Sequence, residues 1–224
     1  MVRDDVLRTL EQNRGQLVSG GTLSRELGVS RTAIWKAIAA LREMGFPIES
    51  VSGEGYRLAE TSDTLSEAGI VMELKTDVLA RNLCVLSTVD STNTYLKQRA
   101  AELPDGYAVI ADCQTAGRGR RGRSFLSPSG SGIYISILLH PTLPLERINM
   151  ITVAAAVALS EAIAETANFT PDIKWVNDVL MHGKKLCGIL TEASVEAETG
   201  QLSYASVGGG INVRTPEGGL PEQI

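Results

Sequence analysis

The sequence predicts an α+β protein of two units, a small helical unit that ends in a hairpin and a larger unit built on a mixed α/β sheet. Two observations predict this fold class. Residues 1–62 carry amphipathic helical patterns, whereas residues 81–224 carry β-branched apolar runs with only two helical segments among them. Residues 63–80, which hold one more short helical pattern, are expected to connect the two units.

The first unit has three predicted helices. The first is amphipathic and ends near Gly15, and the second is short and ends at Gly28. Ser30 is a suitable N-cap for the third helix, which Gly45 ends. The apolar residues of the third helix fall on one face, at Ile34, Ala37, Ile38, Leu41 and Met44.

A hairpin completes this unit. Two short strands, residues 47–51 and 56–59, flank the turn sequence Ser-Gly-Glu-Gly. Helix, short helix, Gly-containing turn, long helix and hairpin is the order of elements in a winged helix-turn-helix. The unit therefore has the elements of a DNA-binding domain, although helix-turn-helix shapes also serve as protein-binding modules.

Local charge decides whether DNA binding is plausible, because the unit carries eight Lys/Arg and eight Asp/Glu in residues 1–60. Arg42 also lies off the apolar stripe of the third helix, and Arg57 is expected to make the hairpin a basic wing. Trp35 is expected to pack between the helix and the wing rather than to touch bases. The residues predicted to form the DNA-binding surface are Ser30, Arg31, Thr32, Trp35 and Lys36.

The second unit has six predicted strands, at residues 83–89, 107–113, 132–140, 172–181, 185–193 and 204–213. One helix begins at Asp90-Ser91-Thr92-Asn93, and another covers residues 146–168. His182-Gly183 predicts a tight hairpin turn between two strands. The apolar stretch 148–164 is alanine-rich and interrupted by Thr, Ser and Glu, so we expect a buried helix rather than a membrane span.

Composition limits the class of protein. The net charge is −5, so any contact with DNA or phosphate must come from local basic clusters. The three cysteines are far apart and odd in number, which indicates reduced thiols in a cytoplasmic protein without a signal peptide or membrane segment. Residues 214–224 are rich in Pro and Gly with no closing element, and from this we expect the sequence to be a fragment.

The strongest local feature is the segment Gly117-Arg118-Gly119-Arg120-Arg121-Gly122-Arg123, called here the arginine loop. Four arginines within seven residues of an acidic protein repel one another unless an anion neutralises them. The loop is suited to a polyanion, because glycines allow close backbone approach and guanidinium groups bind phosphate or carboxylate bidentately. The dinucleotide fingerprint G-x-G-x-x-G is excluded, since a strand follows rather than a helix. A flexible basic surface loop remains the alternative.

Other polar residues accompany strand and helix ends. Ser91-Thr92-Asn93 opens a helix, where it could bind a polar ligand or only cap the helix. Asp178 could hold Mg²⁺ or be a turn carboxylate, and Lys185 could hold an anion or lie in solvent at a strand edge. The run Gly208–Asn212 is dense in glycine, as where a ligand passes close to backbone. No G-x-S-x-G and no Ser or Cys paired with a histidine is apparent, which disfavours a hydrolase.

These segments, in this order, resemble biotin protein ligases, and the N-terminal unit resembles that of the bifunctional group that also represses the biotin operon. The resemblance covers essentially the whole chain. It rests on Ser91-Thr92-Asn93, Gln114, the arginine loop, Lys174-Trp175-x-Asn177-Asp178, Lys185-Leu186-x-Gly188-Ile189-Leu190 and Gly210-Ile211-Asn212-Val213.

The resemblance implies a class II synthetase-like catalytic domain at residues 81–224, without the small SH3-like domain that the family carries at its C-terminus. It implies that biotin and ATP give biotinyl-5′-AMP, and that the biotinyl group passes to a lysine of a biotin carboxyl carrier protein, the partner in acetyl-CoA carboxylase. It also implies a homodimer in the adenylate-bound state that represses transcription at operator DNA. The family's ATP is bound with Mg²⁺, for which Asp178 is the expected ligand.

The resemblance also implies roles for individual residues. Lys185, Arg118 and Arg120 are the expected catalytic residues. The expected biotin-binding residues are Ser91, Thr92, Asn93, Gln114, Arg118, Gly119, Arg120 and Lys185. The expected ATP- and adenylate-binding residues are Arg121, Arg123, Phe125, Asn177, Asp178 and Asn212.

The chain departs from the family pattern at two positions. Val176 stands where the family usually has proline, and Phe125 replaces a frequent tryptophan, which leaves less area to stack on adenine. Two other functions compete with the enzyme and repressor. One is a repressor that uses the second unit only as a sensor, and the other is a lipoate–protein ligase.

Overall fold

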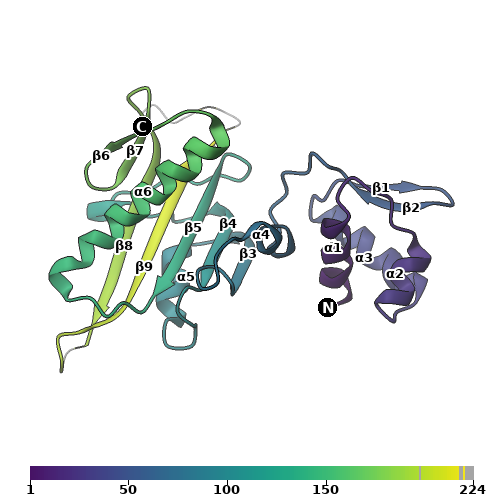
Figure 1. The fold of residues 1–224 in the computed structure, drawn as a ribbon, viewed down its shortest axis with the longest axis horizontal. Coiled ribbons are helices and arrows are strands. Elements are labelled where there is room, and N and C mark those ends of the chain that lie inside the picture. The colour runs from purple at the N-terminus through teal and green to yellow at the C-terminus, as the bar shows by residue number, and fades with distance from the viewer. Residues whose placement is uncertain (197, 217–218, 220–224) are drawn as a thin grey trace. The chain divides into compact units, whose positions relative to one another are not determined.

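The computed structural model describes residues 1–196, 198–216 and 219. The chain forms two compact units, Met1–Lys75 and Thr76–Ile224. In Figure 1 the first is drawn mainly as helices and the second as a large sheet with helices against it. The segment expected to connect the units, residues 63–80, is divided between them by this boundary.

The first unit has the order of elements that its sequence predicts. Ser30 caps α3, because its side-chain oxygen accepts a hydrogen bond from the Ala33 amide at 3.2 Å. The predicted apolar stripe of α3 is buried except for Met44, which is exposed because the helix ends one residue earlier. The elements are α1 (Val2–Gln12), α2 (Gly20–Glu26), α3 (Arg31–Glu43), β1 (Ile48–Val51), β2 (Gly55–Leu58) and α4 (Glu67–Glu73).

The short helix α4 belongs to this first unit through a buried carboxylate. Glu11 of α1 is almost fully buried and accepts a hydrogen bond of 2.7 Å from the hydroxyl of Ser66, the N-cap of α4. Arg14 neutralises Glu11 and also donates to the Ser62 carbonyl at 2.7 Å. Because a buried carboxylate needs such partners, these contacts fix the segment after the hairpin against α1.

The second unit is a sheet of seven strands over the described residues, in the order β3-β4-β5-β9-β8-β7-β6. Strands β3 and β4 are parallel and are joined by helix α5 (Thr92–Arg99), whereas all the other neighbouring pairs are antiparallel. The strands are β3 (Leu83–Val89), β4 (Ala108–Gln114), β5 (Gly132–Leu139), β6 (Asp172–Lys174), β7 (Asp178–Met181), β8 (Lys184–Val195) and β9 (Leu202–Asn212).

One predicted strand was wrong. Residues 172–181 form two antiparallel strands, β6 and β7, with Lys174 opposite Asp178 across the turn. Apolar character misled the prediction here, since Trp175 is 78% exposed and Ile173 also lies at the surface. The predicted turn at His182-Gly183 is confirmed: both residues have positive φ, at 49° and 76°, as a two-residue type I′ hairpin requires.

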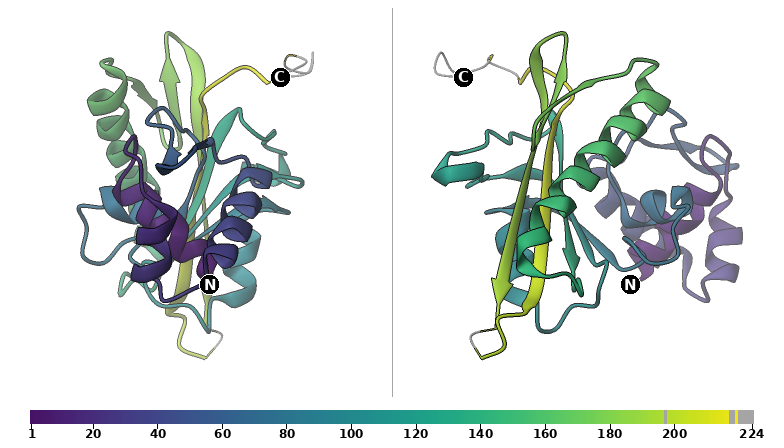
Figure 2. Two further views of the ribbon diagram at one scale, coloured as in Figure 1. Left: turned by 90° about the vertical axis from the view of Figure 1, so that its right-hand side faces the viewer. Right: turned by 60° about the vertical axis from the view of Figure 1, so that its left-hand side comes forward.

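The two faces of the sheet carry different layers, as the alternation of side chains along a strand dictates. On β9, Ser206 and Gly208 face α5 and its buried residue Asn93, whereas Val207 and Ile211 pack beneath helix α6 (Ile148–Ala167). Figure 2 shows α6 running along the sheet. Ser136 of β5 lies on the α5 face.

Helix α6 was expected to be buried, and that expectation was wrong. Only Thr152 and Ala156 of this helix are buried, because it contacts the sheet along one narrow stripe. By length and composition alone, Leu145–Ala167 could also cross a membrane. Beneath it, burial raises the pKa of the Cys187 thiol to about 12, so this cysteine stays protonated at neutral pH.

Candidate functional site

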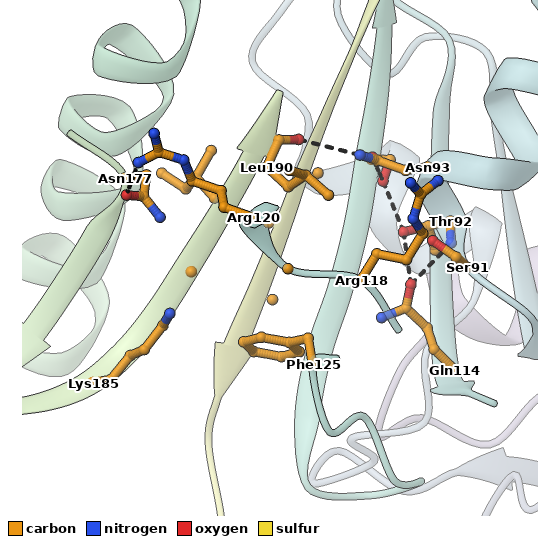
Figure 3. A pocket seen from close by; sticks show the side chains of 17 residues that line it. Ser91, Thr92, Asn93, Gln114, Arg118, Arg120, Phe125, Asn177, Lys185 and Leu190 are labelled. Carbon is orange, nitrogen blue, oxygen red and sulfur yellow. Dashed lines mark hydrogen bonds between the residues drawn. The ribbon is translucent and has the colours of Figure 1, made fainter. Parts of the chain in front are cut away.

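A pocket lies on the α5 face of the sheet, between the start of α5, the arginine loop and the glycine-rich parts of β8 and β9 (Figure 3). It contains roughly 450 Å³ of empty space, part of which is open to solvent. The residues that line it are Ser91, Thr92, Asn93, Gln114, Arg118, Gly119, Arg120, Phe125, Ser136, Asn177, Lys185, Gly188, Ile189, Leu190 and Gly208–Gly210.

The arginine loop forms a hairpin above this pocket. Gln114 pairs with Ser127 and Arg118 with Ser124, and the Gly119 amide donates to the Arg123 carbonyl at 2.7 Å. Arg120–Gly122 forms the tip, where Arg121 and Gly122 have positive φ of 58° and 73°. The backbone of the loop is therefore paired with itself on both sides of the tip.

The floor of the pocket is a polar cluster centred on Asn93, which is 3% exposed. Its side-chain oxygen accepts from Ser136 at 2.7 Å and from Ser206 at 3.0 Å. Its side-chain nitrogen donates to the Leu190 carbonyl at 3.2 Å and to Glu192 at 3.1 Å. An amide side chain accepts two hydrogen bonds and donates two, so protein partners take all four. Asn93 thus shapes the floor.

A second chain of hydrogen bonds joins α5 to the base of the arginine loop. The amide and hydroxyl of Thr92 both donate to the side-chain oxygen of Gln114, at 2.9 and 3.1 Å. The Gln114 nitrogen donates in turn to the Ser127 hydroxyl at 2.8 Å. The Ser136 hydroxyl oxygen also lies 2.7 Å from the Thr92 hydroxyl oxygen, so both chains form one buried network.

The glycines of β9 make room for two side chains that enter the pocket. A Cβ on Gly208 would lie 2.5 Å from the Asn93 side-chain oxygen, and one on Gly210 would collide with the ring of Phe125. The Phe125 ring also meets the edge of Tyr134, with 6.5 Å between ring centroids. Glycine at these positions therefore keeps the aromatic ring and the polar floor close to the sheet.

One wall of the pocket is cationic. Arg120 at the loop tip donates to the side-chain oxygen of Asn177 at 2.6 Å, and Lys185 pairs with Asp178 at 2.8 Å. Figure 3 shows Arg120 and Asn177 on one side of the pocket, with Arg118, Thr92 and Ser91 on the other. The arrangement can bind an elongated ligand that has a neutral polar head and an anionic end.

The sequence-predicted site residues divide into two sets. All eight predicted biotin-binding residues line this pocket, together with Phe125 and Asn177. Four predicted adenylate residues do not line it. Arg121 and Arg123 are exposed, Asp178 is held by Lys185, and Asn212 donates to the Lys185 carbonyl at 3.3 Å.

The predicted DNA-binding residues lie together on exposed positions of α3 and its cap. Trp35 does not pack between helix and wing as expected, because its side chain is 62% exposed. The wing is also less basic than predicted, since Arg57 pairs with Glu49 at 2.6 Å. Arg42 is tied to the wing through the Ile48 carbonyl at 2.8 Å. Arg31 and Lys36 are thus the basic side chains of this surface for which the described part of the chain shows no ion pair.

Two family models match the chain. A biotin/lipoate A/B protein ligase family model matches residues 85–212, which hold the whole pocket, and a helix-turn-helix domain model matches residues 2–57. The chain belongs to the biotin/lipoate A/B protein ligase family. Its predicted fold class, a helix-turn-helix domain followed by a biotin-ligase catalytic domain, is confirmed.

Relatives of this family share both units. The chain is 40% identical to the bifunctional ligase/repressor BirA of Bacillus subtilis over 226 residues, which span all of this chain and 68% of that protein. It is 36% identical to BirA of Escherichia coli over 199 residues, covering 89% of this chain and 60% of that protein. The structure resembles biotin protein ligase from Aquifex aeolicus in complex with biotin and ATP, with a TM-score of 0.54, 40% identity and coverage of 64% and 56%.

The sequence did not indicate two residues that hydrogen-bond the polar floor of the pocket. Ser136 is fully buried beneath the pocket, and Glu192 contacts Asn93 from β8. A signal for Ser136 was present, because it falls between Tyr134 and Leu138 on the inward face of a strand where an apolar residue is usual. For Glu192 the signal was a lone carboxylate within an apolar strand.

We expect Ser136→Ala to lower the free energy of unfolding by about 1–3 kcal/mol, because it removes the buried hydroxyl that contacts both the Asn93 and the Thr92 oxygens. Urea denaturation measures this. Ser203→Ala, at an exposed position of β9, is the matched control and should change stability little. Equal stability of the two variants would show that the buried network contributes nothing to the fold.

Proposed function

We propose that this protein activates biotin with ATP to biotinyl-5′-AMP and transfers the biotinyl group to a lysine of a biotin carboxyl carrier protein. The observation that carries the proposal is the pocket itself, which combines a neutral, fully hydrogen-bonded floor with Arg120 and Lys185 on one wall. A ureido ring suits the floor, because it is polar and uncharged. A carboxylate and a phosphate suit the cationic wall.

The first step joins two anions, so charge neutralisation and positioning are what the protein must supply. A carboxylate oxygen of biotin attacks the α-phosphorus of ATP, and the bond to pyrophosphate breaks. Lys185 lies where it can exchange Asp178 for the carboxylate or α-phosphate, and Arg120 can move from the neutral Asn177 oxygen to a phosphate oxygen. Phe125 offers its ring as the stacking surface for adenine.

The second step needs only a nucleophile and an open pocket. The uncharged amine of the acceptor lysine attacks the acyl carbon of the adenylate, AMP leaves with the electrons of the broken acyl–oxygen bond, and the amine nitrogen releases one proton to water as the amide forms. The arginine loop covers the mixed anhydride until then, which keeps water from it. The loop backbone is closed by its own hairpin bonds, so it covers the pocket as a unit.

The ATP of this proposal carries Mg²⁺. No group of three or more His, Cys, Asp or Glu side chains that could hold a metal occurs in the described part of the chain. One carboxylate is nonetheless enough for an ion that arrives on phosphates. Lys185 and Asn177 both contact the Oδ1 atom of Asp178, so Oδ2 is the oxygen that would take the ion. The ion would supply charge neutralisation at the phosphates.

We further propose that the helix-turn-helix unit binds operator DNA of biotin synthesis genes in the cytoplasm, as a homodimer that the adenylate favours. The exposed basic side chains of α3, Arg31 and Lys36, support this proposal together with the bifunctional relatives. The adenylate then reports biotin supply, because it accumulates only when acceptor protein is scarce. Such coupling is allosteric if adenylate changes the affinity of the dimer.

The ligase proposal predicts that purified protein with biotin, Mg²⁺ and α-labelled ATP forms labelled biotinyl-AMP. Lys185→Met should lower kcat/KM by about 100-fold, because a cation at the developing charge is lost. Lys184→Met, at the exposed neighbouring position, is the control and should retain activity. Activation of lipoate and not biotin would make the substrate assignment wrong, and no adenylate with either acid would leave a sensor without enzyme activity.

The DNA proposal predicts that the protein enriches a specific duplex from a random-sequence pool, and does so better with biotinyl-AMP present. Lys36→Ala should weaken binding of that duplex about tenfold, since one contact to a base or phosphate is lost. Arg57→Ala is the matched control, because Arg57 already pairs with Glu49. If no duplex is enriched in either state, the unit is a protein-binding module.

A further inference from the structure

Glu192 connects the floor of the pocket to the arginine loop. It lies on β8 opposite Ser206, and its side chain is 17% exposed. Its Oε1 atom lies 3.0 Å from the Lys97 ammonium and 3.1 Å from the Arg118 guanidinium, and its Oε2 atom accepts from Asn93 at 3.1 Å. One carboxylate thus bridges helix α5, the pocket floor and the first arginine of the loop.

This bridge makes Arg118 different from the other loop arginines. No carboxylate oxygen of the described residues lies within 4.0 Å of Arg120, Arg121 or Arg123. Arg118 is therefore compensated before any ligand arrives, whereas Arg120 contacts only the neutral oxygen of Asn177. In Figure 3 the two side chains point apart, Arg118 toward Ser91 and Thr92 and Arg120 toward Asn177.

We propose that Glu192 is a positioning residue that anchors Arg118, and through it the arginine loop, over the pocket. The expected effect of Glu192 on adenylate retention rests on the proposed ligase function. Its expected effect on opening of the loop rests on the structure alone. Arg118 is then a structural anchor, and its positive charge offsets the repulsion between the Glu192 carboxylate and an anionic ligand. Arg120 is the arginine that remains available to phosphate.

The partner arrangement explains why the anchor holds. Lys97 and Arg118 share one oxygen of Glu192, so the cluster of three charged groups keeps one net positive charge. Because Glu192 is largely removed from water and also bonded to Asn93, its position is fixed by the sheet and the buried network. An arginine held by a fixed carboxylate has few alternative orientations. The loop hairpin that carries it is restrained in the same way.

The first test measures the loop without any ligand. Limited trypsin cleavage after Arg120, Arg121 and Arg123, located by mass spectrometry, reports how often the loop opens. Glu192→Gln should increase this cleavage about fivefold, the effect of losing one partly exposed ion pair. Lys97→Met is the matched control, since it removes the other cation from the same oxygen, and it should leave cleavage near the parent rate.

The second test measures dissociation of biotinyl-AMP from the full chain, which we expect Glu192→Gln to accelerate about fivefold. The double variant Arg118→Met with Glu192→Gln should release adenylate no faster than Arg118→Met alone. Glu192→Asp keeps the charge but shortens the side chain. If Glu192→Gln does not fold, Glu192→Asp replaces it in both measurements. It should open the loop in the same direction.

Two results would overturn the proposal. One is equal loop cleavage in the Glu192 and Lys97 variants. The other is a double variant whose fold increase in the rate of biotinyl-AMP dissociation equals the product of the increases in the two single variants. Failure of the ligase function is recognised separately, because the trypsin measurement needs neither biotin nor ATP. If the parent chain forms no adenylate, the proposed role of Glu192 is tested by loop cleavage alone.

Discussion

The second unit depends on one constraint, the complete hydrogen bonding of the buried Asn93 side chain between α5 and the sheet. A buried amide left without partners would cost several kcal/mol, so Ser136, Ser206, Leu190 and Glu192 must all be in place around it. Gly208 follows from the same constraint, because a side chain there would displace the Asn93 oxygen. The polar floor therefore determines where α5, β5, β8 and β9 meet.

Function follows from what the floor leaves free. Since Asn93 is saturated and the Thr92 amide is taken by Gln114, the floor has a fixed shape rather than a flexible set of donors. A rigid neutral surface recognises a small polar ring by shape and by its remaining lone pairs. Arg120 and Lys185 lie on the opposite wall, where the bond between carboxylate and phosphate forms in the proposed reaction, whereas Arg118 on the floor side is already paired with Glu192.

The sequence predicted the elements better than the contacts between them. Period-2 and period-3.6 patterns located the helices and most strands, and the arginine loop indicated an anion site because four clustered arginines repel one another in the absence of an anion. The break in residues 172–181 was not predictable, since Ile173 and Trp175 are apolar yet exposed. Glu192 was missed because its partners Lys97 and Arg118 are distant in sequence and meet only across the sheet.

The floor and the cationic wall of the pocket are expected to bind different parts of the ligand: the floor binds the biotin ring, and the wall binds the phosphate. Titration calorimetry of Arg120→Met with biotin and with biotinyl-AMP tests this most directly. The account predicts that biotin affinity stays within about twofold of the parent, while biotinyl-AMP binds about tenfold more weakly, the loss of one cation–phosphate contact worth ~1.4 kcal/mol. An equal loss of affinity for both ligands would contradict it, because Arg120 would then shape the whole pocket.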